Sequence, residues 1–254
     1  MAFFTLPSGR TRIAHNSFRI DSSIWSASWD GRRWGKARVV SGPRPGTAAF
    51  RAEATRDGRA LVGWIGAARE PTGPRARLRL AWVDGDDVTR LPDAKLGGGI
   101  VQGSLALAVS PTGRAVVLAV RIRGKRRDLV AMRVDDERVG PPQVVLDLTQ
   151  DLNSSGGRIS LDAAIDDGGR VSLLWALSTP PQLRDQQTHA DRLMATDPDP
   201  DGTRGTAIVL DQAETGSGIH SPQIALLKSG QRVVVWYVGR GTESTSDLKA
   251  LRLP

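Results

Sequence analysis

Hydrophobic positions along this chain recur in short runs that each follow a turn glycine. Successive turn glycines are 49 to 61 residues apart, and the run after each alternates or is continuously apolar, as in Ala60-Leu61-Val62-Gly63-Trp64. A repeat of this length is typical of solenoids, propellers and arrays. The glycines are Gly9, Gly58, Gly113, Gly169 and Gly230, and the residues six places after them are His15, Trp64, Ala119, Trp175 and Trp236.

Each repeat predicts four short strands. A strand of small residues precedes the turn glycine, and the run after it is apolar on both faces in four repeats, which is typical of a strand covered on both sides. Dipeptides such as Asp57-Gly58 predict tight two-residue hairpins whose central residues take positive φ. Third strands centre on Ala27, Ala81, Ala131, Ala195 and Ala250, and fourth strands are expected over 37–40, 88–91, 143–146 and 207–210.

Four strands repeated radially predict an all-β fold, a β-propeller of five four-stranded repeats in one domain, the last blade lacking its fourth strand. The repeats cover approximately 1–45, 46–98, 99–150, 151–215 and 216–254. We expect the ring to close between the first and fifth blades, because an open edge strand is an aggregation hazard. The alternatives are an open solenoid, two sandwiches, or a piece of a larger propeller.

The composition agrees with a folded, non-membrane β protein. Of 254 residues, 39% are hydrophobic, none is cysteine, and no apolar run approaches the length of a membrane span. The chain carries no signal-peptide pattern, so an extracellular or cell-envelope location would require a longer exported precursor.

The net charge of +8 is carried by 30 Arg and 5 Lys. Arg10, Arg59, Arg114 and Arg170 all directly follow a turn glycine, and we expect them to pair with acidic turn residues of the scaffold. One segment, 121–127, holds five basic residues in seven. Such a run can bind phosphates or sulfated sugars, or it can be a solvated loop.

No motif for a catalytic nucleophile, a phosphate loop or a metal site is present in full, so no cofactor is expected. Asp197, Asp199 and Asp201 alternate before Gly202 in a pattern that can direct carboxylates at one Ca²⁺. The closing acidic ligand of such a loop is missing, because Ile208 stands at its twelfth position. An expanded hairpin turn is therefore the favoured interpretation.

Paired carboxylates at the propeller axis would indicate a glycosidase. Among the predicted first strands, Glu53 is the only acidic residue in a central position, and one carboxylate cannot supply both acid and base. The sequence therefore favours a non-catalytic module that binds protein or carbohydrate. A glycosidase whose carboxylates come from different blades is the alternative.

The rhythm Asp-Gly-Arg-apolar-apolar-x-Trp, followed by Trp-x-Asp-Gly, resembles the repeats of exported actinobacterial β-propeller proteins, some called sialidase-like. The segment 28–34, Ser-Trp-Asp-Gly-Arg-Arg-Trp, is similar to the aspartate box of sialidases but one residue shorter. Phe18-Arg19-Ile20 is similar to the segment that supplies a substrate-binding arginine in that family, with Asp21 in place of its proline. Tyr237 is the only tyrosine and has no glutamate beside it in sequence, so the sialidase catalytic motifs are not matched.

Long loops are predicted on one face of the propeller, between second and third strands and between blades. Binding residues concentrate on such loops, and a positive potential would favour an acidic protein or carbohydrate partner. We expect no specific nucleic-acid recognition. The candidate ligand-binding residues are Arg69, Arg75, Arg121, Arg123, Arg126, Arg127 and Arg184.

Overall fold

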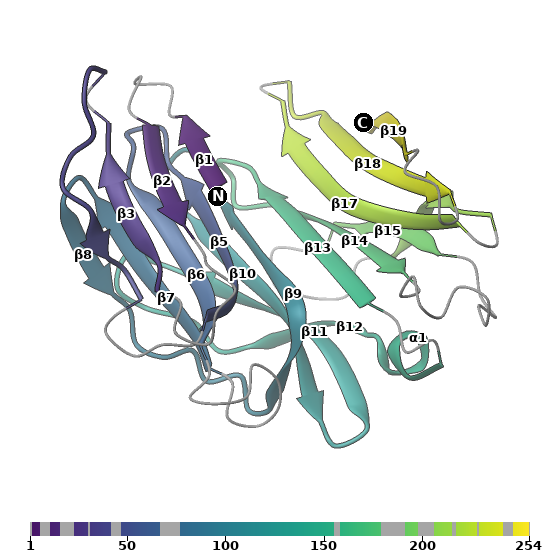
Figure 1. Ribbon diagram of the computed structural model, residues 1–254. Helices are drawn as coiled ribbons and strands as arrows, with labels where there is room; N and C mark the ends of the chain where they lie inside the picture. Colours follow the sequence, from purple (N-terminus) through teal and green to yellow (C-terminus); the bar gives the residue numbers. More distant parts are fainter. Residues whose placement is uncertain are drawn as a thin grey trace.

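Five antiparallel sheets follow one another in chain order in the computed structural model (Figure 1). The structure describes residues 2–5, 11–15, 23–29, 31–41, 47–66, 77–154, 158–178, 191–197, 206–214, 217–227, 229–240 and 246–253. Four sheets have four strands each and the fifth has three within these residues, as the repeats predicted. None of the described helices is long and apolar enough to cross a membrane.

The strands of each sheet are neighbours in sequence. The first sheet contains β1 (Ala2–Thr5), β2 (Thr11–His15), β3 (Trp25–Ser28) and β4 (Arg38–Val39). The second contains β5 (Thr47–Ala54), β6 (Ala60–Gly66), β7 (Arg77–Asp84) and β8 (Asp87–Arg90). The third contains β9 (Gly99–Val109), β10 (Ala115–Arg123), β11 (Arg126–Val134) and β12 (Gln143–Asp147), and the helix α1 (Thr149–Ser154) follows it. The fourth contains β13 (Arg158–Ile165), β14 (Val171–Ser178), β15 (Arg192–Thr196) and β16 (Ile208–Gln212), and the fifth β17 (Ser217–Leu226), β18 (Arg232–Arg240) and β19 (Ser246–Leu253).

The register confirms the repeat. The recurring alanine lies on the third strand of every sheet and pairs with the second strand, for example Ala81 with Val62 and Ala195 with Leu174. The first strands begin earlier than the sequence suggested, because β9, β13 and β17 extend well upstream of their small-residue segments.

The hairpin turns differ from the predicted two-residue type. In the second sheet the Gly58 N–H donates to the Thr55 carbonyl and the Thr55 N–H to the Arg59 carbonyl, and Gly58 has φ +97°. This three-residue loop needs left-handed backbone at the glycine alone. Gly113, Gly169 and Gly230 repeat the pattern, also with positive φ.

A buried tryptophan lies in each layer between neighbouring sheets. Trp64 packs between the first and second sheets, Trp82 between the second and third, and Trp175 between the third and fourth. Trp236 packs between the fourth and fifth. The predicted burial of Trp64, Trp175 and Trp236 is confirmed, since their exposed fractions are 2%, 2% and 4%.

Two of the arginines after the turn glycines pair with acidic turn residues, as expected, whereas a third donates to a backbone carbonyl instead. Arg59 lies over the ring of Trp82 and pairs with Asp136 of the third sheet at 2.5 Å. Arg114 donates to the carbonyl of Gly168 in the fourth sheet at 2.8 Å. Arg170 lies near Asp166 of its own turn, and Arg10 falls outside the described residues.

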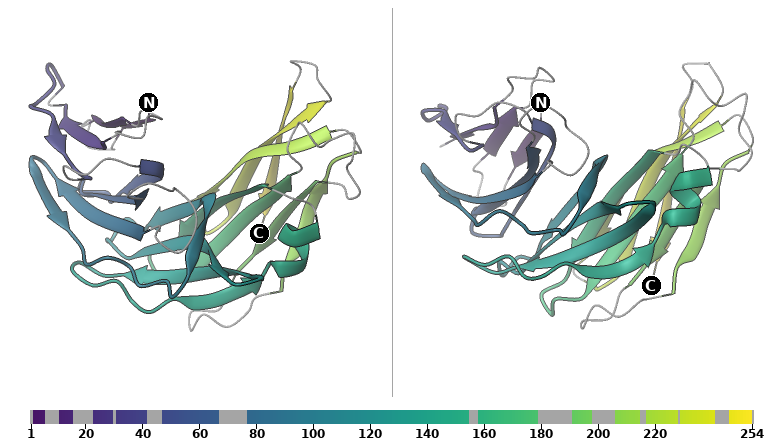
Figure 2. Two further views of the ribbon diagram at one scale, coloured as in Figure 1. Left: turned by 60° about the horizontal axis from the view of Figure 1, so that its bottom comes forward. Right: turned by 90° about the horizontal axis from the view of Figure 1, so that it is seen from below.

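The described sheets form an arc, with the first and fifth sheets at its two ends (Figure 2). The first strands β5, β9, β13 and β17 lie side by side in that order along its inner side. Tyr237 and Leu248 of the fifth sheet are 45% and 61% exposed. They pair across β18 and β19, so this face lacks the cover that a closed ring would give it within the described residues. The predicted closure is therefore not what these elements form.

Candidate functional site

The basic segment 121–127 forms the end of the β10–β11 hairpin. Arg121 is buried and donates to the Leu96 carbonyl at 3.1 Å and to the Asp128 carboxylate at 2.9 Å. Arg123 and Arg126 also donate to Asp128, at 3.0 and 2.6 Å. Burial raises the pKa of Asp128, but the hydrogen bonds from the three arginines outweigh it and hold the pKa below its usual value. Arg121 thus stabilises the hairpin, while Arg123 and Arg126 stay about half exposed.

The other residues singled out by sequence are not brought together by the described structure. Arg127 donates to the carbonyls of Gly124 and Arg126, and Asp197 pairs with Arg232. The part of the chain that the structure describes holds no group of three acidic or histidine side chains placed to bind a metal ion. Arg69, Arg75, Arg184, Asp199 and Asp201 lie outside the described residues, so the ligand-binding and Ca²⁺ interpretations stay predictions.

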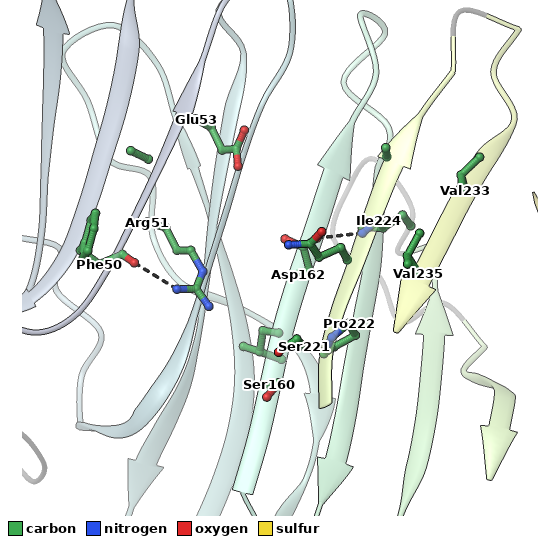
Figure 3. A pocket seen from close by; sticks show the side chains of 14 residues that line it. Phe50, Arg51, Glu53, Ser160, Asp162, Ser221, Pro222, Ile224, Val233 and Val235 are labelled. Atoms are coloured by element: carbon green, nitrogen blue, oxygen red, sulfur yellow. Dashed lines mark hydrogen bonds between the residues drawn. The ribbon is translucent and has the colours of Figure 1, made fainter. Parts of the chain in front are cut away.

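Two carboxyl groups instead line the same cavities on the inner side of the arc. Glu53 lies on β5 and Asp162 on β13, the first strands of the second and fourth sheets. They face the same space from opposite sides, and Arg51 extends into it beside Glu53 (Figure 3). Both carboxyl groups are largely buried, although first strands at an axis are mostly lined by small apolar residues.

Burial makes both carboxyl groups weaker acids than usual, because it raises their pKa values. It raises the pKa of Glu53 from 4.5 to about 7, with the negative charge of Asp162 adding to the rise and the positive charge of Arg51 opposing it. Burial likewise raises the pKa of Asp162 from 3.8 to about 6, against backbone N–H groups and Arg51, which lower it. Near neutral pH the two groups therefore differ in protonation, Glu53 holding its proton to higher pH.

Cavities lie on both sides of this pair. One, of about 670 Å³, is lined by Phe50, Arg51, Ser160, Ser221, Gln223 and other residues toward the starts of the first strands. The second, of about 610 Å³, extends to the turns at 166–168 and 230. Glu53, Asp162, Ile224 and Ala225 line both, so the carboxylates lie where the two cavities meet. Both cavities have the size of a site for a small ligand.

Strained backbone occurs at the first cavity. Ser221 has φ +48°, the only positive φ among the described non-glycine residues, and it precedes Pro222. The pairing of β17 with β18 shifts between His220 and Gln223, which identifies a bulge at this point. Strain of this kind persists where the surroundings enforce it and clusters at ligand sites. The bulge places Ser221 and Gln223 in the cavity lining.

The expectation that Glu53 is the lone carboxylate of the first strands is wrong. The sequence placed the fourth first strand at residues 163–165, whereas β13 begins at Arg158 and includes Asp162. Glu53 stands five residues before its turn glycine and Asp162 seven before its own, so aligning the repeats did not superpose them. The usable signal was the alternation of polar Ser160 and Asp162 with buried Leu161 and Ala163.

Comparison with known proteins identifies the fold but no sequence family. No protein-family model and no curated protein sequence matches the chain. Among solved structures, an α-L-arabinanase of Penicillium chrysogenum in complex with arabinobiose is similar with a TM-score of 0.60 and 9% identity, over 98% of this chain and 79% of that one. A polysaccharide lyase of family PL25, an ulvan lyase bound to a GlcA–Rha3S saccharide, has a TM-score of 0.56 and 11% identity over 96% of this chain.

A third similar structure is the GH93 α-L-arabinofuranosidase of Fusarium graminearum with arabinobiose, with a TM-score of 0.52 and 13% identity over 82% of this chain. The chain spans 66% of the ulvan lyase and 62% of the arabinofuranosidase, just under two thirds of each. All three similar structures are β-propeller enzymes that act on carbohydrates. At these identities the likeness concerns architecture, and the chain has the all-β propeller fold that its repeats predicted.

Proposed function

We propose that this protein hydrolyses glycosidic bonds, with Glu53 as general acid and Asp162 as the partner carboxylate. The observation that carries the proposal is the buried pair itself, two carboxyl groups with separated pKa values where two cavities meet. Glycosidases need one protonated and one ionised carboxyl group on either side of the scissile bond. The carbohydrate-active enzymes of similar fold support the substrate class.

The argument for a purely binding module depended on a lone carboxylate, and that premise no longer holds. Glu53 has the higher pKa and keeps its proton near neutral pH, so it protonates the leaving glycosidic oxygen. Asp162 has the lower pKa and accepts an N–H bond from Ile224, so it is ionised first. Asp162 then either takes a proton from the attacking water or bonds to the anomeric carbon.

Hydrolysis can be tested by incubating the purified protein with arabinan, xylan, pectin and glycosaminoglycans and measuring new reducing ends. We expect release from at least one polymer, and a loss of at least about a hundredfold in Glu53→Gln and in Asp162→Asn, because each removes one half of the acid–base pair. Glu137→Gln and Asp135→Asn, at exposed residues away from both cavities, are the matched controls and should keep full activity.

Three results would contradict the proposal. They are no release from any polymer, equal activity in all four variants, or products with an unsaturated sugar end, which indicate elimination rather than hydrolysis. NMR of the anomeric proton in the first product distinguishes the two roles of Asp162, since a nucleophile retains the configuration and a base inverts it.

A further inference from the structure

A single arginine enters the larger cavity next to the carboxylate pair. Arg51 precedes Glu53 by two residues on β5, and residues two apart on a strand project from the same face. Arg51 extends from β5 into the space that Asp162 faces from β13 (Figure 3). Its side chain is exposed to this cavity of about 670 Å³ rather than packed in the core.

The hydrogen-bonding capacity of Arg51 is mostly unused. A guanidinium carries five N–H donors in a planar fork. Within the described residues Arg51 donates one hydrogen bond, to the carbonyl of the adjacent Phe50 at 3.1 Å. It has no ion pair with Glu53 or Asp162 there, although its positive charge lowers the pKa of both. The remaining donors thus face the cavity.

Apart from Arg51 and the two carboxyl groups, this cavity is lined by neutral groups. Ser160, Ser221 and Gln223 offer hydroxyl and amide groups that suit sugar hydroxyls, and Phe50 offers an apolar ring. A neutral polysaccharide requires no cation here. An acidic sugar would be repelled by Asp162 unless its charged group lay on the Arg51 side of the cavity, where a planar fork fits a carboxylate or sulfate in a bidentate manner.

We propose that Arg51 binds the acidic group of an anionic sugar, a uronate carboxylate or a sulfate ester, in the unit next to the scissile bond. This inference rests on the proposed glycosidase function, because it names the substrate class of the same site. Arg51 is a specificity residue in this arrangement. It selects acidic over neutral sugars, whereas Glu53 and Asp162 cleave the glycosidic bond.

A purely electrostatic role for Arg51 predicts a different pattern. If Arg51 served only to lower the pKa of the two carboxyl groups, its loss would shift the pH profile equally for acidic and neutral ligands. A specificity role predicts that the ratio of the two affinities changes. The measurement must therefore compare ligands that differ only in charge.

The test measures binding of monosaccharides to the whole chain by titration calorimetry or ligand-observed NMR. Glucuronate, glucose 6-sulfate and glucose are the probes, since none has a bond to hydrolyse. We expect at least one acidic sugar to bind at least about tenfold more tightly than glucose. Arg51→Gln should bring this ratio close to one, and Arg51→Lys should keep part of it, because lysine retains the charge without the fork. Arg77→Gln, at the exposed first residue of the otherwise largely buried β7, is the control and should keep the ratio.

The outcomes separate this inference from the proposed function. Preference for glucuronate assigns a uronate and preference for glucose 6-sulfate assigns a sulfate ester, and both support the proposal. Equal binding of the three sugars, no binding of either acidic sugar, or a preference that survives Arg51→Gln overturns it. Arg51-dependent binding without hydrolysis of any polymer would overturn only the catalytic proposal. Hydrolysis of neutral polymers without an acidic preference would overturn only this inference.

Discussion

The carboxylate of Asp162 accepts a hydrogen bond from the backbone N–H of Ile224, 2.8 Å away on the neighbouring sheet. This bond favours the ionised form and offsets part of the rise in pKa that burial imposes on Asp162. The pKa of Glu53 is lowered only by the charge of Arg51. A single contact between the fourth and fifth sheets thus helps to decide which carboxyl group is ionised first.

The raised pKa of Glu53 makes folding stability depend on pH. The unfolded chain loses this proton near pH 4.5 and the folded chain near pH 7, so the folded state binds more protons in between. The contribution of Glu53 to the free energy of unfolding should therefore be largest below pH 4.5, fall as the pH rises to about 7, and then level off. Charges facing Glu53 from other elements are those of Asp162 and, across the second cavity, Arg56, Asp166 and Asp167.

Urea denaturation of Glu53→Gln between pH 4.5 and 8 checks this dependence. The variant should lose most of the slope and exceed the native protein at pH 8 by up to about 3 kcal/mol, the free energy equivalent of the shift. Asp162, raised to about 6, should leave a smaller residual slope. Glu137→Gln should follow the native curve, and a native curve that is flat over this range would contradict the burial of Glu53.

The rate of hydrolysis should have a narrow bell-shaped pH profile. The rising limb reports ionisation of Asp162 near pH 6 and the falling limb deprotonation of Glu53 near pH 7, although both values belong to the coupled pair. Glu53→Gln should abolish the falling limb in its residual kcat/KM. A maximum outside this region would show that other groups carry the protons.

Replacing Trp175 by alanine should lower the free energy of unfolding by about 3–5 kcal/mol, because it empties a large volume between the third and fourth sheets. Trp34, which is 43% exposed and lies with its ring tilted against that of Trp29, is the matched control and should cost about 1 kcal/mol. Denaturant unfolding followed by circular dichroism compares the two. Similar losses would mean that the packing between these sheets is looser than described.

The basic hairpin can be tested without touching its buried arginine. Changing Arg123, Arg126 and Arg127 together to glutamine removes exposed charge and leaves the Arg121–Asp128 pair in place. If this hairpin meets an acidic partner, the variant should elute from heparin at clearly lower salt than the native protein. The control changes Arg33, Arg77 and Arg138 together to glutamine and has the same net charge. Equal elution of the two variants would show that heparin binding depends on net charge and not on this hairpin.

Ser221 offers a test of backbone strain at the cavity. A side chain at positive φ costs about 1 kcal/mol relative to glycine. Ser221→Gly should therefore be more stable than Ser221→Ala by about that amount in thermal unfolding. Both variants should weaken sugar binding because both lack the hydroxyl group. An alanine variant as stable as the glycine variant would argue against a left-handed conformation at this residue.

Much of the fold could be predicted because the constraints on it are local. A glycine such as Gly113 is favoured where the hairpin backbone takes positive φ. A large side chain such as Trp64 or Trp175 fills the space between two sheets. The tryptophan therefore recurs six residues after the turn glycine in several repeats. The turn type was missed because a two-residue and a three-residue loop share the same glycine. The prediction of a closed ring was wrong because closure depends on contacts between the first and fifth repeats, which no local pattern encodes.

The site was harder to predict because its parts occupy non-equivalent positions in different repeats. Glu53 could be singled out as an acidic residue in a strand of small side chains, but Asp162 lies two positions further from its turn. Only the three-dimensional arrangement brings them together. Arg51 carried no signal of its own in a chain with 30 arginines, and its role depends on which cavity it enters.

The strand between the two carboxylates bears neither of them. β9 lies between β5 and β13 and directs Leu105 and Leu107 toward the second sheet, and Ala106 and Ala108 toward the fourth. These four side chains fill the space between β9 and the two neighbouring sheets. Their size therefore helps to set the distance between Glu53 and Asp162. Carboxylate separation distinguishes inverting from retaining hydrolysis. The stereochemistry of the reaction would then depend on the apolar packing around β9, where Ala108 also lines the second cavity.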